Sequence, residues 1–483
     1  MKKWSVLLAS LIALEAISIM FYLARAGQFG FPLDDAWTHQ AYARNLGLHG
    51  MMAFSPGIPS PGSTSFLWTL LLAIGYFLKA PFFLWTMFWG GIFAVATAFV
   101  AALLNHNYFG NFRNSVIVAI ICIFEWHLAW AAVSGMEIGF FTCLTLLFFL
   151  LLPHNVSPLV LGTLTGLIVL VRPEGVLLAV IYGFKLLFTQ PREIKRTLFQ
   201  GALFASMFLI IISPWIAFNF TYAHHPFPNT VTAKFMHYGY PWSPLRSLGY
   251  LWNVFLFFLN GSLLLLFPGA CFKLYNSIRK KDKLHHQPLF WFIILIGIYA
   301  VTLPFIYDEG RYLMPLIPLV IVYGVEGIGQ FLEIALRTSF MRLTAWILLF
   351  VSVLALWIIG SAQYSNRIQF YKLVHMQVAQ WINDHAPQDA VIATHDIGII
   401  GYFSNRQIVD LAGLVTPEMV PIMNDPQKTA EYLRSKHASY LIVYSGYYHK
   451  LINLLNTRLV LSPNPELMMA EGVGTFDVYQ IGK

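Results

Sequence analysis

Two adjacent carboxylates, Asp34 and Asp35, open a polar segment directly after the first long apolar run of the chain. A carboxylate pair in this position suits a general base or a metal site at a bilayer surface. It would equally suit the first turn of an amphipathic helix that lies on the membrane, is capped by one of the two and ends near Gly47 or Gly50. His39, one turn after Asp35, would either share such a site or be an interfacial polar residue. The residues alone leave both interpretations open.

Two cations lie in polar segments that border apolar runs. Arg311 follows Asp308 and Glu309, so it would either pair with one of them or bind an anionic phosphate. Lys234 lies in a polar loop and has the same two interpretations. Both residues are therefore candidates for a phosphate site.

Three further ionisable residues interrupt apolar stretches. Glu137 precedes one such stretch, and Arg172 and Glu174 flank Pro173 in another. Ionisable groups at membrane depth are costly and often functional. The alternative is a structural ion pair that holds broken helices together.

The amino-acid composition indicates that membrane-spanning helices position these residues. Of the 483 residues, 58% are hydrophobic and 11% are charged, against about 25% charged in soluble domains. The excess lies in blocks long enough for helices of about 20 residues that cross a bilayer. The first block runs from Lys2 to about Ala26 and predicts an uncleaved helix. Further candidate spans are 64–79, 82–104, 115–133, 136–152, 157–171, 175–189, 198–220, 248–268, 288–305, 312–332 and 343–361.

Basic connections set the orientation. Segments 191–196, 273–283 and 337–342 are rich in Lys and Arg, which places them in the cytoplasm. The N-terminus is then cytoplasmic, and residues 27–63, 221–247, 306–311 and everything after about 362 lie outside. Twelve full spans would contradict this alternation. Because Arg172-Pro173-Glu174-Gly175 breaks the run 157–189, we expect about 11 crossings of the plasma (inner) membrane.

The sequence does not favour a nucleic-acid partner, and it does not favour a cysteine-based metal site or a disulfide framework. The net charge of +8 is explained by the short basic loops, so we predict no nucleic-acid partner. The three cysteines show neither metal-site spacing nor a disulfide framework.

Residues 363–483 have the alternation of an α/β domain and would lie outside the membrane. Expected strands are 390–394, 407–410, 440–444 and 475–481, and expected helices are 368–385 and 426–436. At about 120 residues this domain can hold its own core. No Gly-rich phosphate loop precedes a helix. His395, Asp396 and Asp410 follow or end strands and are turn residues or face an acceptor.

Short motifs run through nearly the whole chain in a fixed order. They are, in order, Asp34-Asp35-Ala36 with Tyr42-Ala43-Arg44-Asn45-Leu46, Gly62-Ser63-Thr64-Ser65-Phe66-Leu67-Trp68, Ser134-Gly135-Met136-Glu137, Arg172-Pro173-Glu174-Gly175, Pro228-Asn229-Thr230 with Ala233-Lys234, Arg311-Tyr312 with Pro315 and Pro318, and Asp396-Ile397-Gly398 with Asp410-Leu411-Ala412-Gly413-Leu414. In these motifs the sequence resembles the membrane glycosyltransferases of the GT-C fold. It is most similar to the branch that contains mycobacterial arabinofuranosyltransferases. Protein mannosyltransferases and the lipid A aminoarabinose transferase carry Lys-Pro where this chain has Ser-Pro-Gly-Ser-Thr-Ser, which argues against those branches.

The resemblance implies a function and a set of site residues. It implies transfer of a hexosyl or pentosyl group, with inversion, from a polyprenyl-phosphate donor to a glycan, lipid or protein outside the cytoplasm. The acidic pair would activate the acceptor, with Asp34 favoured as base and a divalent metal as an additional option at the pair. Arg311 and Lys234 would bind the donor phosphate. Further candidates from the matching motifs are Arg44, Glu137, Arg172, Glu174, Asn229 and Tyr312.

Two alternatives come from other classes. A transporter or flippase of lipid-linked sugars would also need many helices and intramembrane charges, but transporters usually show internal repeats, which this sequence lacks, and give no reason for the domain after 362. A non-catalytic scaffold of envelope synthesis is the second alternative. Loss of transfer on changing the acidic pair in a folded protein would separate the three.

Overall fold

The computed structural model describes residues 2–154, 156–189, 193–234, 236, 243–279, 286–303, 305–466 and 474–482. The chain divides into two compact units. Unit 1 consists of Met1–Gly27, Met87–Ser213 and Pro241–Tyr364, and unit 2 of Gln28–Thr86, Pro214–Tyr240 and Ser365–Lys483.

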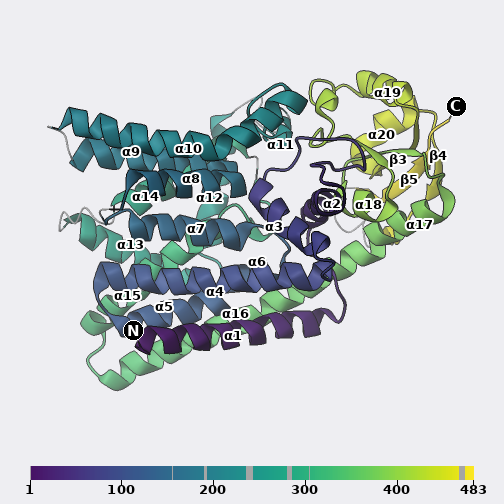
Figure 1. The fold of residues 1–483 in the computed structure, drawn as a ribbon. Coiled ribbons are helices and arrows are strands. Elements are labelled where there is room, and N and C mark those ends of the chain that lie inside the picture. Colours follow the sequence, from purple (N-terminus) through teal and green to yellow (C-terminus); the bar gives the residue numbers. More distant parts are fainter. Residues whose placement is uncertain are drawn as a thin grey trace. The chain divides into compact units, whose positions relative to one another are not determined.

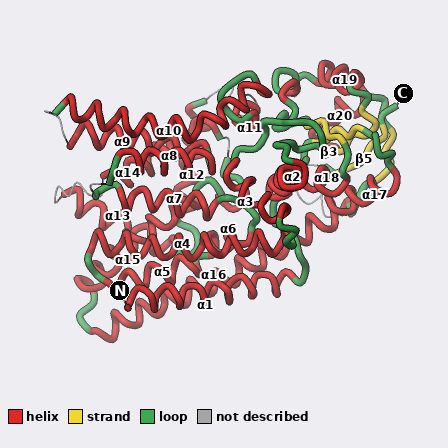
Figure 2. The backbone as a smooth tube through the Cα atoms, viewed as in Figure 1, coloured by secondary structure: helices red, strands yellow, loops and turns green. Residues whose placement is uncertain are grey.

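Unit 1 is built of helices, and the strands of Figure 2 belong to unit 2. The helices that lie in unit 1 or extend into it are α1 (Lys2–Ala26), α4 (Phe82–Phe109), α5 (Phe112–Phe124), α6 (Trp126–Val133), α7 (Ile138–Leu151), α8 (Pro158–Val171), α9 (Leu177–Thr189), α10 (Ile194–Ala223), α12 (Pro244–Phe258), α13 (Leu263–Arg279), α14 (His286–Thr302), α15 (Ile317–Ala335) and α16 (Ser339–Tyr371).

Several of these helices are long and apolar enough to cross a membrane. Within the described residues there are five: Lys2–Ala26, Phe82–Phe109, Ile194–Ala223, Asp308–Ala335 and Ser339–His385, or up to seven if each of two bent pairs forms one span. Four shorter apolar helices accompany them. The protein is therefore a multi-pass membrane protein, as predicted, while the number of 11 crossings stays a prediction.

Two predicted spans are broken. The span expected at 115–133 bends by 55° between α5 and α6, because Glu125 has an extended backbone and its carboxylate accepts a hydrogen bond from Leu128 N that caps α6. The span expected at 248–268 is a pair, α12 and α13, bent by 104°. The predicted interruption at Arg172 is confirmed, since α8 ends there and the 3-10 turn Pro173–Val176 follows.

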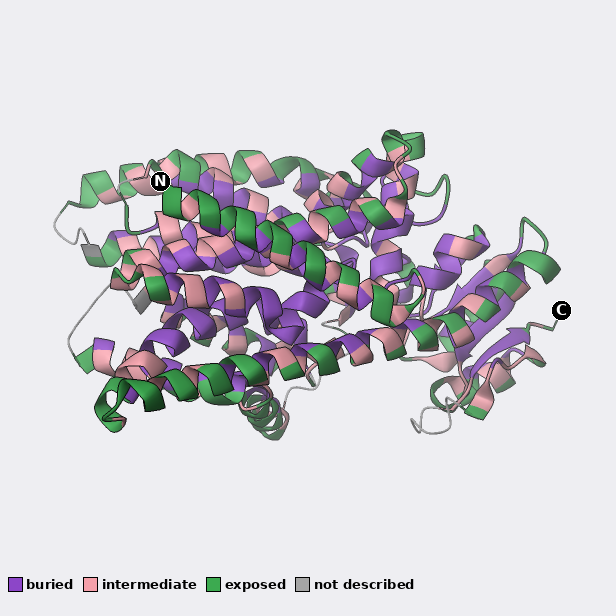
Figure 3. Ribbon diagram, turned by 90° about the horizontal axis from the view of Figure 1, so that it is seen from below, coloured by how far each residue is buried: buried purple, intermediate pink, exposed green. Residues whose placement is uncertain are grey.

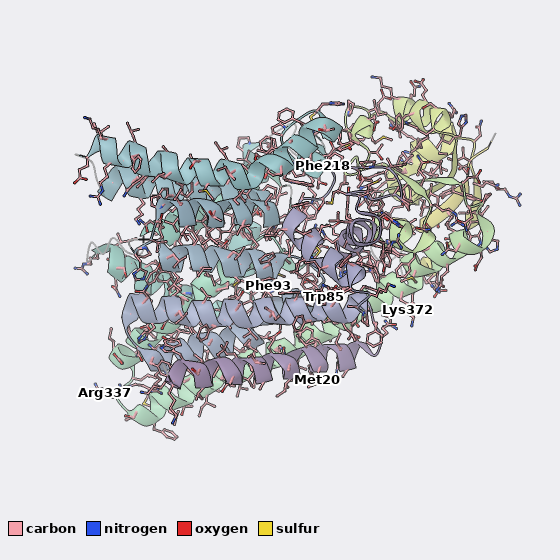
Figure 4. All side chains as sticks on the ribbon, in the orientation of Figure 1. Met20, Trp85, Phe93, Phe218, Arg337 and Lys372 are labelled. Atoms are coloured by element: carbon pink, nitrogen blue, oxygen red, sulfur yellow. The ribbon has the colours of Figure 1, made fainter. Side chains whose placement is uncertain are left out.

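Close approach and aromatic stacking hold unit 1 together. A Cβ atom on Gly327 of α15 would lie 1.8 Å from the carbonyl oxygen of Gly269 on α13, so these two helices meet backbone to backbone. Phe93 of α4 (Figure 4) stacks on Phe140 of α7 with ring centroids 4.1 Å apart. Met20 of α1, also labelled there, is exposed, as expected of a side chain that faces lipid.

Unit 2 combines helices with one five-stranded sheet. Its helices are α2 (Asp34–His49), α3 (Phe66–Phe77), α11 (Asn229–Lys234), α17 (Gln377–His385), α18 (Gly398–Ser404), α19 (Pro426–Ser435) and α20 (Ser445–Leu454). Its strands are β1 (Val391–Thr394), β2 (Gln407–Asp410), β3 (Ala438–Tyr444), β4 (Arg458–Leu461) and β5 (Phe476–Gln480). The order is β2-β1-β3-β5-β4, in which β2, β1 and β3 run parallel while β5 and β4 pair antiparallel.

The expected α/β architecture of residues 363–483 is confirmed, with one strand missed. β1, β2, β3 and β5 coincide with the predicted strands within two residues, and α19 with the predicted helix. β4 is a partly exposed edge strand of four residues, and its short run Leu459–Leu461 has no alternation of apolar and polar residues that would mark a strand. Figure 3 shows the central strands buried between helices.

Helix α2 ends where the sequence predicted but is not capped as predicted. Gly50 follows it in a left-handed conformation, and its N–H donates to the carbonyls of Asn45 and Leu46. The N-cap position is Leu33, and no side chain caps it. Asp34 and Asp35 are the first two residues of the helix and not its N-cap residue.

Candidate active site

The Asp34 carboxylate binds a different helix of unit 2. Its Oδ2 accepts a hydrogen bond from Gly398 N at 2.6 Å, and its Oδ1 accepts one from Ile399 N at 2.8 Å. These amides open α18, where backbone N–H groups have no helical partner. Asp34 therefore joins the start of α2 to the start of α18 and holds its own carboxylate in one orientation.

Gly398 is required for this approach. A Cβ atom at this position would lie 1.9 Å from the Asp34 backbone oxygen and 2.9 Å from its Cγ. Real side chains never come so close to a backbone atom. The Asp396-Ile397-Gly398 motif thus requires glycine because Gly398 contacts Asp34, which lies 364 residues away in the sequence.

Asp396 organises a second set of side chains at the end of β1. His375 Nε2 lies 3.0 Å from its Oδ2, His395 Nδ1 lies 2.9 Å from its Oδ1, and the Tyr444 hydroxyl donates to Oδ2 at 2.9 Å. His375 is fully buried in the π-helical segment Lys372–Met376. Such segments are rare and often mark functional sites.

These contacts set the proton affinities around Asp34. Burial and the charge of Asp396 raise the pKa of Asp34 to about 7, against the opposing charge of His375 and the two amide hydrogen bonds. Burial also favours neutral Asp396, but the hydrogen bonds and charges of His375 and His395 outweigh it and hold the pKa of Asp396 well below its usual range. Asp34 is therefore poised near neutral pH, whereas Asp396 is firmly ionised.

A third carboxylate lies at the end of β2. Asp410 accepts hydrogen bonds from Ala412 N at 2.8 Å and Val415 N at 3.0 Å, which makes it the turn residue that the sequence indicated. Burial raises its pKa to about 6. The pKa of His395 is raised although burial lowers it, because Asp396 hydrogen-bonds the ring and Asp396, Asp410 and Asp34 add negative charge.

Four sequence motifs meet in a second set of contacts in unit 2. Asn229 is buried, and its amide donates to the carbonyl of Gly413. Thr230 donates to the carbonyl of Gly62 at 2.5 Å, and Gly62 N donates to the Tyr42 hydroxyl at 3.0 Å. Asn229 therefore holds two loops together, and its role as a site residue stays a prediction.

Arg44 links two helices within unit 2. Its guanidinium donates to the Tyr402 carbonyl at 2.8 Å and stacks on the Tyr402 ring at 4.6 Å, which links α2 to α18.

The other predicted residues of unit 2 are buried to different degrees. Asp35 is partly buried in α2, and His39 is buried in the same helix. Lys234 ends α11 and is partly buried.

Five predicted residues form one cluster in unit 1. Arg172 lies 3.3 Å from Glu174 and 3.7 Å from Glu137, and its guanidinium lies over the Tyr312 ring at 5.0 Å. Tyr299 donates to Glu174 at 2.8 Å. The structure thus contains the ion-pair group beside a helix break that the sequence allowed as the structural alternative. It consists of Glu137, Arg172 and Glu174.

Arg311 joins this cluster through Tyr312. Its guanidinium lies 5.2 Å over the Tyr312 ring, and its Nε lies 3.4 Å from Asp308. Asp308 and Glu309 both have positive φ values, 39° and 55°, so a strained turn presents Arg311. The side chain is buried, which adds to the strength of any charged hydrogen bond it makes.

The surroundings of the acidic pair bear on the predicted metal option. Among the described residues, no group of three or more His, Cys, Asp and Glu side chains could hold a metal ion. Both oxygens of Asp34 face backbone N–H groups, and those of Asp396 face His375, His395 and Tyr444. Amide donors thus hold both Asp34 oxygens, and a divalent metal at the acidic pair stays a prediction.

Sequence reasoning missed three partners. His375 lies within a long helical run, and no local signal separates it from an ordinary core residue. Tyr444 ends a predicted strand, next to the predicted His395 and Asp396, so its position at the same sheet edge could have been inferred. No motif in the sequence marked Tyr299 as a partner of Glu174.

The comparisons with known proteins agree on the fold. Residues 356–478 match a family model described as a domain of unknown function (DUF8728). ArnT from Cupriavidus metallidurans in the apo state has a TM-score of 0.64 at 14% identity, over 99% of this chain and 98% of ArnT. The chain has the GT-C fold.

The fold of a second solved structure is also similar. The Archaeoglobus fulgidus oligosaccharyltransferase in complex with Zn and sulfate has a TM-score of 0.62 at 13% identity, over 92% of this chain and 69% of that one. The arabinofuranosyltransferase AftD from Mycobacteria, in the form of a mutant, has a TM-score of 0.42 at 13% identity, over 98% of this chain and 42% of AftD. No curated protein matches the sequence. The expected GT-C architecture is confirmed.

Proposed function

We propose that this protein transfers a sugar from a polyprenyl-phosphate donor to a hydroxyl group of an acceptor on the outer side of the membrane. The fold supports a lipid-linked donor, because ArnT has the same fold and a structure of it is bound to undecaprenyl phosphate. The observation that carries the proposal is the Asp34 carboxylate, fixed by two amides and with its pKa raised to about 7.

Asp34 acts as the general base in this proposal. The acceptor hydroxyl loses its proton to the carboxylate as its oxygen bonds to the anomeric carbon of the donor sugar. The bond between that carbon and the phosphate oxygen breaks, and its electron pair stays on the phosphate. Attack opposite the leaving phosphate inverts the anomeric configuration. A base with a pKa near the working pH is efficient in this step.

Cations stabilise the departing phosphate in this scheme. Arg311 is a buried guanidinium whose planar fork can bind two phosphate oxygens, and Lys234 adds a point charge. Asp35 points about 100° away from Asp34 around α2 and therefore has a different task, for which orienting the acceptor is our assignment. The type of sugar, hexosyl or pentosyl, is left open.

The test compares Asn substitutions at the two positions of the acidic pair. Purified protein is incubated with a set of polyprenyl-phosphate sugars and cell-envelope acceptors, and transferred sugar is measured. We expect one variant, Asp34→Asn, to lose nearly all transfer and Asp35→Asn to lose less. Near-normal transfer by both would show that the base lies elsewhere.

A flippase of lipid-linked sugars is the second candidate because of the two bent helix pairs, since interrupted helices line many transporter sites. It would move a fluorescent lipid-linked sugar across a proteoliposome without forming a glycosylated product. Such movement with no transfer to any acceptor would favour the flippase.

A further inference from the structure

The parallel part of the sheet in unit 2 has a topological switch point. The strand order is β2-β1-β3, so the chain leaves β1 toward one side for β2 and crosses to the other side for β3. In open α/β sheets, ligands bind outside the carboxyl ends of the strands at such a point. The edge between β1 and β3 is therefore where a ligand of this unit is expected.

Polar groups converge at this edge. His395 and Asp396 follow β1, and Tyr444 ends β3 and donates to Asp396. The His395 side chain is 34% exposed. Its Nδ1 bonds to Asp396, and its Nε2 makes no hydrogen bond to any residue that the structure describes. One ring nitrogen is thus fixed and the other is available to a ligand.

Tyrosines flank the same edge. Tyr447, in the first turn of α20, is 69% exposed, and its ring centroid lies 6.4 Å from that of Tyr444. The Tyr448 ring lies 6.0 Å from the His395 ring. The exposed ring of Tyr447 and the partly buried ring of Tyr448, beside a carboxylate and an imidazole, offer an apolar face together with hydrogen-bonding groups.

We propose that this edge binds the acceptor of the reaction and that the acceptor is a carbohydrate. A sugar ring lies against Tyr447 and Tyr448, and its hydroxyl groups hydrogen-bond to His395 Nε2. Three carboxylates, Asp34, Asp396 and Asp410, act on His395, which disfavours an anionic ligand. The polar groups disfavour a lipid chain.

This inference rests on the proposed function and specifies its acceptor class. Gly398 and Ile399, the amides that hold the Asp34 carboxylate, come two and three residues after Asp396. The base and the proposed sugar site are therefore neighbours within unit 2.

The experiment measures binding without turnover. Saturation-transfer NMR on the full-length protein in nanodiscs uses neutral malto-, xylo- and arabino-oligosaccharides as probes, with no donor present. We expect at least one probe to bind, and Tyr447→Ala to weaken it about three- to tenfold, the range of one aromatic contact. Tyr447→Phe keeps the ring face and should bind as the wild type does. Tyr275→Ala removes a tyrosine of similar exposure from α13 and is the matched control.

Each outcome decides the inference. No binding by any probe, or equal binding by the wild type and Tyr447→Ala, would overturn the carbohydrate site. Equal losses in Tyr447→Ala and Tyr447→Phe would overturn the stacking contact. Binding by a protein that transfers no sugar would keep this site and reject the proposed transferase. With an active enzyme, Tyr447→Ala should raise the KM for the acceptor and leave kcat within about twofold.

Discussion

The ionisable cluster of unit 1 and that of unit 2 differ in charge balance. In unit 1, Arg172 lies between Glu137 and Glu174 and contacts both, so opposite charges meet. In unit 2, Asp34 and Asp396 act on each other, and imidazoles are the nearby positive groups. Balanced charge holds broken helices in place, as an ion pair in a membrane should. Burial, together with the unbalanced charge of Asp396, raises the pKa of Asp34, which is what acid-base chemistry needs.

The largest effect is expected from Asp34→Asn. It removes the proposed base, so turnover should fall about 10²–10⁴-fold. It also places an amide NH2 against a backbone N–H, because an amide has one acceptor oxygen and the native carboxylate uses two. We therefore expect a loss of about 1–3 kcal/mol in the free energy of unfolding.

This second effect must be separated from the first. Turnover is corrected for the folded fraction measured by thermal melting, and Asp35→Asn serves as the control of the same chemistry. A variant that is less stable but fully active once corrected would leave Asp34 with a structural role alone.

Gly398→Ala should break the contact between α2 and α18 without replacing a titratable group. The added Cβ meets the Asp34 backbone, so the free energy of unfolding should fall by about 1–3 kcal/mol and transfer should fall with it. Gly249→Ala is the control, since a Cβ there has open space. Equal melting temperatures for Gly398→Ala and the wild type would contradict the observed approach.

Arg311→Lys tests the cluster of unit 1. If Arg311 binds the donor phosphate through both arms of its guanidinium, Lys should raise the donor Kd by about ten- to a hundredfold, because a charged hydrogen bond contributes about 1.5–3 kcal/mol. Lys234→Ala should weaken donor binding less. Arg337→Lys changes an exposed arginine (Figure 4) and should have no effect. Normal donor affinity in both Arg311→Lys and Lys234→Ala would reject the phosphate assignment.

Accessibility labelling of single cysteines in intact cells tests the predicted orientation. Ser277, a natural choice from the sequence, is buried, so Arg279→Cys on the basic loop and Lys450→Cys on α20 are better reporters, since both side chains are exposed. Cys271 must be replaced first because it is exposed, whereas Cys122 and Cys143 are buried. We expect labelling at position 450 and protection at 279. The reverse pattern would overturn the topology.

The sequence predicted elements and motifs better than it predicted partners. Apolar blocks and alternation located most helices and four of the strands, because burial imposes a period on the residues. The bends at Glu125 and between α12 and α13 were missed, because capping and a turn inside an apolar run leave the hydropathy unchanged. Partners such as Gly398 for Asp34 lie hundreds of residues away, and no local pattern encodes such a contact.

The pH dependence of transfer tests the role of Asp34 most directly. The base must be ionised, and its pKa is raised to about 7, so kcat/KM should rise tenfold per pH unit below about 7 and level off above it. The same profile for Asp34→Asn should lack this acid limb, while the profile for Asp35→Asn should keep it. An acid limb near pH 4, or one near 7 that persists in Asp34→Asn, would contradict the account.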